Sequence, residues 1–200
     1  MAAGLLRGIC AQMSHLVILL EEPSAKAMLE GLVPRIVPEA TAVRFIVFEG
    51  KQDLEKQLTR KLRAYLVPEA RFVVVMDQDM ADCVAVKRRL SGLCTAAGHS
   101  DAVVRIACRE LESWYLADFP ALARAYDRPA LLRSSEKARY RVPDSIVTPS
   151  KELKAIVPEY QKIDGSRKLG KELDPANARS TSFRHLVAAI RSLASEEIAI

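Results

Sequence analysis

The amino-acid sequence predicts an α/β fold with a mainly parallel, four-stranded sheet flanked by helices. Two observations lead to this class: four short apolar runs lack polar alternation, and segments with helical periodicity separate them. Such runs are typical of strands buried on both faces. Their alternation with helices is typical of a parallel sheet.

The four expected strands are rich in Val, Ile, Leu and Phe. They are LVILL (16–20), VRFIVF (43–48), RFVVVM (71–76) and AVVRIAC (102–108). Because none of them alternates with polar residues, we expect each to be covered on both sides by helices.

Helices are expected between these strands. The first begins at Ser24, a good N-cap residue, and Pro34 should kink or end it. The second, KQDLEKQLTRKLRAYL, places four leucines on one face, at positions 54, 58, 62 and 66. The third, ADCVAVKRRLSGLCTAAG, ends on Gly98, which suits the position after a helix C-cap.

The pattern changes after the fourth strand. RELESWYLADFPALARAY (109–126) predicts one or two helices, in which Trp114 and Tyr115 are expected to pack in the core. A polar stretch follows from Asp127 to about Ser150. The remainder predicts a short helix (Lys151–Val157), a basic loop at KIDGSRKLGK (162–171) and an amphipathic helix near Ser182–Ala194, capped by Ser180 and Ser182.

The domain organisation follows from this pattern. The sequence contains no repeat and no sign of a second hydrophobic core, so we expect a single domain over residues 1–200. Its α/β core should span about 14–126, and a helical C-terminal extension should span about 127–200.

Composition limits the classes of protein to consider. Thirty Lys and Arg against 25 Asp and Glu give a net charge of +5, a mild excess that is compatible with a polyanionic partner. Cys10, Cys83, Cys94 and Cys108 form no C-x-x-C pair, so we expect free thiols in a reducing cytosol and no zinc site.

The N-terminal stretch MAAGLLRGICAQMSH resembles a signal peptide only faintly, because Gln12, Ser14 and His15 interrupt it. No apolar run approaches the roughly 20 residues that span a membrane. We therefore expect a cytoplasmic protein without a membrane segment.

Carboxylates follow all four expected strands. Glu21 and Glu22 follow the first, Glu49 and Asp53 the second, Asp77, Asp79 and Asp82 the third, and Glu110 and Glu112 the fourth. Ligands of open α/β sheets bind beyond the carboxyl ends of the strands, which is where these acids should lie. Some of them, Asp53 and Asp82 in particular, are expected to be acids that favour a helix start.

Asp77 and Asp79 are harder to explain as helix-start acids. A D-x-D pair directly after VVVM places like charges close together, and a hard divalent cation with oxygen ligands relieves that repulsion. Haloacid-dehalogenase phosphatases carry Thr or Val where this chain has Ala81, and D-x-D glycosyltransferases are generally larger.

A strand-end Glu followed about fifty residues later by D-x-D resembles the Toprim domain, an Mg²⁺-binding α/β module of topoisomerases, primases and nucleases of the overcoming-lysogenization-defect type. More specifically, LLEEPSAKAML, FEGKQDL, VVVMDQDMADC and RELESWYLAD resemble the bacterial family called domain of unknown function 4276. SRKLGKELDPANARSTSFRHLVAAI is similar to that family's C-terminal segment, so the resemblance covers nearly the whole chain.

One departure concerns Glu22. The family usually has E-G-P-S where this chain has E-E-P-S, and glycine would permit a positive φ or a close approach of backbone to ligand. Glu22 therefore puts either the turn geometry or the catalytic competence of this chain in doubt, unless its side chain simply points to solvent, as we expect.

The resemblance implies a metal site. Asp77 and Asp79 would hold one or two Mg²⁺ or Mn²⁺ ions, and Glu21 would complete the ligand set or act as general acid or base. Glu112 is the candidate for a further ligand. Helical spacing would place Glu110 on a different face from Glu112, so only one of the two should enter the site.

Basic residues near the same edge could hold phosphate groups. Lys51 beside Gly50 is the best placed, and Lys168, Lys171 and Arg179 form the basic part of the tail. The resemblance implies a nuclease acting on nucleic acid. It also implies an ATPase partner in a two-component phage-defence or DNA-repair system, because relatives are often encoded beside an ATPase.

Two other functions remain open. The chain could be a catalytically inactive, partner-binding or regulatory subunit with the same fold, or a phosphohydrolase of small phosphate esters. The amphipathic last helix is also compatible with packing against a second copy, which would make a homodimer.

Overall fold

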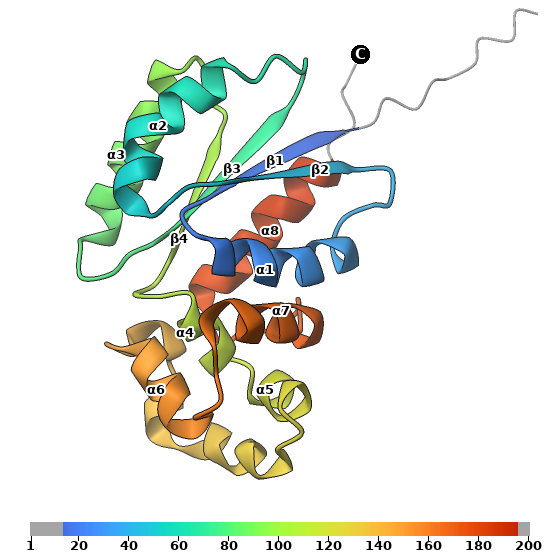
Figure 1. Ribbon diagram of the computed structural model, residues 1–200, viewed down its shortest axis with the longest axis vertical. Helices are drawn as coiled ribbons and strands as arrows, with labels where there is room; N and C mark the ends of the chain where they lie inside the picture. Colours follow the sequence, from blue (N-terminus) through green and yellow to red (C-terminus); the bar gives the residue numbers. More distant parts are fainter. Residues whose placement is uncertain (1–13, 196–200) are drawn as a thin grey trace, which may run out of the picture.

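The computed structural model describes residues 14–195, so the faint signal-peptide resemblance and Cys10 lie outside the described part of the chain. The expected α/β fold is confirmed. Four parallel strands form one sheet in the order β2-β1-β3-β4, and helices cover both of its faces (Figure 1).

The strands lie close to their expected positions. They are β1 (His15–Leu20), β2 (Ala42–Val47), β3 (Arg71–Asp77) and β4 (Val103–Ala107). β1 and β3 lie in the middle of the sheet, and their apolar side chains are buried on both faces. β2 is an edge strand, and its residues are partly exposed.

One face of the sheet packs against α2 (Lys51–Arg63) and α3 (Cys83–Ala96). Leu54, Leu58 and Leu62 are fully buried there, whereas Leu66 is 86% exposed. The expectation for Leu66 was wrong because α2 ends at Arg63, three residues before it.

The opposite face packs against α1 (Pro23–Leu32) and α8 (Thr181–Ser195). The sheet thus separates two hydrophobic clusters, one on each of its faces. α8 belongs to this packed layer, although the sequence placed it in an extension.

The expected start of the first helix was one to two residues late. Glu22 is the N-cap of α1 and Pro23 follows it at the first helical position, where a missing N–H costs nothing. Pro34 ends the helix as expected, within the 3₁₀ turn Val33–Arg35. Gly98 follows the C-cap of α3 with φ of 92°, also as expected.

The rest of the chain forms a helical region beyond the carboxyl end of the sheet. It comprises α4 (Glu112–Leu116), α5 (Phe119–Ala125), the 3₁₀ turns Pro129–Glu136, Ala138–Tyr140 and Pro143–Ser145, then α6 (Pro149–Ile156) and α7 (Lys162–Glu172). Trp114 and Tyr115 are buried in the core, as expected. Ser180 accepts from the Phe183 N–H and caps α8, while Ser182 instead accepts a hydrogen bond from the Trp114 indole.

The expected basic loop at 162–171 was wrong, because this segment is α7. Gly165 and Gly170 disfavour a helix locally, but Gly170 allows the backbones of α7 and α1 to come into contact. A Cβ at Gly170 would lie 2.1 Å from the Met28 carbonyl oxygen. Close packing of two helices has therefore overridden local propensity.

No helix among residues 14–195 combines the length and the apolar character needed to cross a membrane.

Candidate functional site

The acids expected at the carboxyl end of the sheet gather around one cavity. Asp77 and Asp79 follow β3, and Glu110 and Glu112 follow β4. All four line a cavity of about 390 Å³. β3 and β4 are parallel neighbours in the sheet, so the residues that follow them lie at the same edge, as expected.

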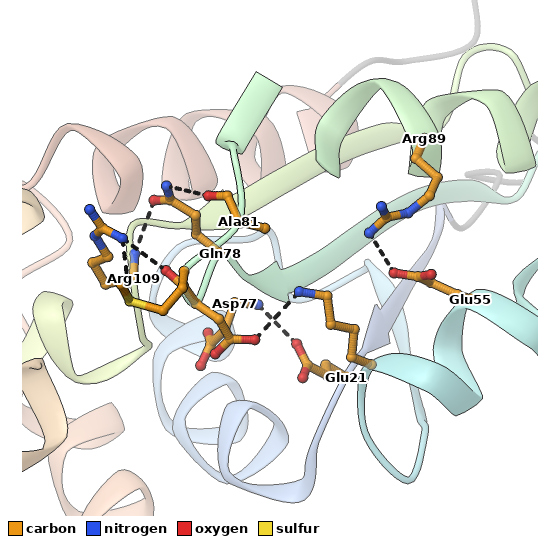
Figure 2. Close-up of polar contacts among 10 residues, drawn as sticks. Glu21, Glu55, Asp77, Gln78, Ala81, Arg89 and Arg109 are labelled. Carbon is orange, nitrogen blue, oxygen red and sulfur yellow. Dashed lines mark hydrogen bonds and ion pairs between the residues drawn. The ribbon is translucent and has the colours of Figure 1, made fainter. Parts of the chain in front are cut away.

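Glu21 lies beside this cavity and links two strands. Its carboxylate accepts a hydrogen bond of 3.0 Å from the Asp77 backbone N–H, which joins the end of β1 to the end of β3 (Figure 2). Burial raises the pKa of Glu21, and the charges of Asp79 and Glu22 add to this effect. Glu21 is therefore positioned as expected, next to the D-x-D pair.

Asp77 has the most strongly perturbed carboxyl of the group. Desolvation raises its pKa well above the usual range for aspartate, and the negative charges of Glu22, Glu21 and Glu112 raise it further. Glu112 is only 1% exposed, and burial raises its pKa too, although the Tyr160 hydroxyl donates to it at 2.9 Å. These carboxylates therefore repel one another in a poorly solvated place.

The loops after β3 and β4 are held together by unusual backbone. Asp79 and Arg109 both adopt positive φ, 54° and 62°. The Asp79 N–H donates to the Arg109 carbonyl at 2.7 Å. The Arg109 N–H donates to the Gln78 side chain at 3.2 Å (Figure 2). Left-handed backbone is uncommon outside glycine and is found preferentially at functional sites.

Glu110 corrects an expectation. We expected only one of Glu110 and Glu112 to enter the site, on the ground that both would lie in one helix. α4 begins at Glu112, so Glu110 lies in the preceding turn and also lines the cavity. Its carboxylate accepts a hydrogen bond of 2.7 Å from the Ser150 N–H.

Glu22 also departs from expectation. Its φ of −146° is extended backbone that any residue adopts, so no glycine is needed at this turn. Its side chain does not simply point to solvent: the carboxylate accepts from Lys162 Nζ at 2.6 Å and from the Ser24 hydroxyl.

The other strand-end acids have structural roles. Asp82 is the N-cap of α3 and accepts from the Ala85 N–H at 2.7 Å. Asp53, in the first turn of α2, accepts from the Glu49 N–H at 3.1 Å. Both are helix-start acids, as expected.

Of the basic residues suggested by the sequence, only Lys51 contacts an acid of the D-x-D pair. Its Nζ lies 3.5 Å from the Asp79 carboxylate. Lys168 pairs with Asp164 at 3.0 Å instead, and Arg179 donates to the Tyr140 carbonyl at 2.6 Å in a separate cavity of about 530 Å³. Lys168, Lys171 and Arg179 do not line the acid cavity.

The cavity wall opposite the acids contains residues that the sequence did not indicate. They come from α6, from the two residues before α7 and from its first residue: Ser150, Lys151, Lys154, Tyr160, Gln161 and Lys162. The basic character of 162–171 was a signal for Lys162. No local pattern marked Lys151 or Lys154, which long-range folding brings to the site.

The donor set suits a hard cation in its chemistry, because carboxylate oxygens are the ligands preferred by Mg²⁺ and Mn²⁺. Within residues 14–195, however, no three His, Cys, Asp or Glu side chains form a ready-made metal-binding group. Several of the acids are held by other partners: Glu22 by Lys162, Asp79 by Lys51, and Glu112 by Tyr160.

Comparison with known proteins gives a family but no characterised relative. The family model described as Domain of unknown function (DUF4276) matches residues 20–191. Neither the curated proteins nor the solved structures contain a match to this chain.

Proposed function

The chain belongs to the DUF4276 family, and from this premise we propose that it is a Mg²⁺- or Mn²⁺-dependent phosphodiesterase of the Toprim type that cleaves nucleic acid. One observation carries the proposal. Asp77, Asp79 and Glu112 line a single cavity at the carboxyl end of a parallel sheet, with Glu21 hydrogen-bonded to the Asp77 backbone. Acids with raised pKa values in a cavity, such as Asp77 and Glu112, are typical of catalytic sites.

Glu21, Asp77, Asp79 and Glu112 are the residues that would hold the metal. A bound divalent ion supplies a water of lowered pKa and stabilises charge on a phosphate. Asp79 has the greatest freedom to change partner, because its side chain is 52% exposed and its contact with Lys51 is 3.5 Å long. Release of that contact would leave the Lys51 ammonium free for a phosphate oxygen.

The chemistry of the chain's own residues agrees with this assignment. Glu21 lies where it could accept a proton from a nucleophilic water, since burial and neighbouring negative charge raise its pKa and make it a stronger base. Asp77 gains the most from a cation, because its negative charge is desolvated and repelled by neighbouring acids.

Cleavage of plasmid DNA and of tRNA by the purified chain tests the proposal. We expect products with Mn²⁺ or Mg²⁺, none with a chelator, and at least a roughly 100-fold loss in the Asp77→Asn/Asp79→Asn double variant. Asp127→Asn is the matched control: Asp127 is exposed and, like Asp79, has a positive φ that asparagine tolerates.

Thermal unfolding provides a second readout that does not depend on substrate. Mn²⁺ should raise the Tm of the unaltered chain and of Asp127→Asn, but not that of the double variant. Without metal, Asp77→Asn should itself be stabilising by about 1 kcal/mol, because it removes a buried, repelled charge. Absence of both cleavage and Mn²⁺-dependent stabilisation would refute the proposal.

A second candidate function is a catalytically inactive subunit that binds a partner, such as an ATPase in a two-component defence or repair system in the cytoplasm. The absence of a ready-made metal group within the described residues, and the pairing of Glu22 with Lys162, favour this reading. Hydrolysis of a chromogenic phosphate monoester, lost in Asp77→Asn, would instead identify a small-molecule phosphohydrolase.

A further inference from the structure

We propose that α6 forms the phosphate-binding wall of the acid cavity, and that this wall selects single-stranded nucleic acid. Lys151 and Lys154 are the residues that hold the phosphates next to the one that reacts. The inference rests on the proposed nuclease function and names its substrate class.

The wall is fixed to the acids by two hydrogen bonds. The Ser150 N–H donates to Glu110 at 2.7 Å, and the Tyr160 hydroxyl donates to Glu112 at 2.9 Å. Glu112 and Tyr160 are both buried. These contacts hold the region from residue 150 to 160 against the turn after β4, so the lysines between them have a defined position beside the acids.

Lys151 and Lys154 are available to a ligand, whereas Lys162 is not. Lys162 is bonded to Glu22 at 2.6 Å. Lys151 and Lys154 are exposed, and within the described residues neither makes a hydrogen bond or an ion pair. They lie three residues apart in α6 and therefore on one face of that helix, as two cations that follow a phosphate backbone would.

The cavity's dimensions favour a flexible strand. Its volume of about 390 Å³ is near the lower end for ligand sites, about 300–1,000 Å³. Glu112 is 1% exposed, so it lies at the buried end of the acid group, whereas the Asp79 side chain is 52% exposed. A duplex has a persistence length of about 150 base pairs, so bending it to bring one phosphate toward the buried Glu112 costs free energy. A single strand or a frayed end bends there at much lower cost, which is why we expect it to bind more tightly.

Fluorescence anisotropy with a fluorescein-labelled oligothymidylate of about 20 nucleotides tests the inference, since single-strand sites cover about 4–16. The full chain is used with EDTA, so that binding is measured without cleavage. Lys151→Gln/Lys154→Gln should weaken binding about tenfold and reduce the slope of log K against log salt by about 1.4, or about 0.7 for each lost phosphate contact.

Lys168→Gln/Lys171→Gln is the matched control. It removes the same charge from the same C-terminal region, at positions that do not line the cavity. We expect it to bind as the unaltered chain does. The corresponding duplex should bind at least about tenfold more weakly than the single strand. Both pairs are exposed, and equal Tm values will show that folding is intact.

Three results would overturn the inference: no effect of the Lys151/Lys154 change, an equal effect of the control change, or equal binding of duplex and single strand. Failure of the nuclease function would look different. Then metal-dependent cleavage would be absent while the Lys151/Lys154 binding pattern persisted. Cleavage that depends on Asp77 but not on Lys151 or Lys154 would refute only the present inference.

Discussion

Glu22 combines a backbone role and a side-chain role that a glycine could not perform. With φ of −146° it caps α1, and its carboxylate ties the start of that helix to Lys162 at the start of α7. The side chains of this pair are 50% exposed for Lys162 and 23% exposed for Glu22, so solvent screening limits the strength of the ion pair.

Glu22→Gly converts this chain to the sequence usual in the family. We expect a loss of no more than about 1 kcal/mol in unfolding free energy, because a partly exposed ion pair is lost while the turn remains accessible. Urea denaturation measures the change, and Glu22→Gln separates loss of charge from gain of backbone freedom. A gain in stability with glycine would contradict the view that Glu22 suits this turn.

The contact between α1 and α7 depends on the absence of a side chain. Gly170 approaches Met28 so closely that a methyl group would overlap the Met28 backbone, with 2.1 Å to its oxygen and 2.8 Å to its carbon. Because backbone rather than a flexible side chain is the obstacle, the helices would have to separate.

Gly170→Ala should therefore destabilise the protein by about 2 kcal/mol or more, despite the higher helix propensity of alanine. Gly92→Ala is the matched control, since Gly92 lies within α3 and a Cβ there would meet nothing within 4 Å. That change should stabilise by up to about 1 kcal/mol. If both alanines raise the Tm, the close approach of α1 and α7 is not required.

The same elements show which features could be predicted from the sequence. The strands were placed within a residue or two because burial on both faces leaves an uninterrupted apolar run. α7 was not predicted, because its two glycines have low helix propensity. Only the close packing of α7 on α1 explains why Gly170 is there. Acids at strand ends could be located from topology. The positions of Lys151 and Lys154 could not be predicted, because tertiary packing brings them to the cavity and no local sequence pattern marks them.

At the scale of the whole molecule, α8 joins the C-terminal region to the sheet. Phe183 and Leu186 share one hydrophobic cluster with Leu16 and Ile18 of β1. The Trp114 indole donates to Ser182 at 2.7 Å, which links α4 to α8. The helical region and the sheet therefore share buried contacts, which favours cooperative unfolding.

We expect a single unfolding transition in which far-ultraviolet circular dichroism coincides with fluorescence of Trp114, the chain's one tryptophan. Phe183→Ala should lower stability by about 3–5 kcal/mol and shift both signals together. Arg184→Ala, at an exposed position of the same helix, should change it by less than about 0.5 kcal/mol. Separate transitions would mean that the C-terminal region folds independently of the sheet.

The packing of α8 on the sheet also affects how the chain folds while it is being translated. β1 is synthesised well before α8, the helix that shares its hydrophobic cluster and begins only at Thr181. Until then Leu16 and Ile18 lack their final cover, and such long-range contacts form slowly because closing a long loop costs entropy. Between the synthesis of β1 and that of α8 the nascent chain thus exposes part of an apolar sheet face, and such exposed surface is what chaperones bind. The acid cavity gains the α6 wall only shortly before this cover arrives.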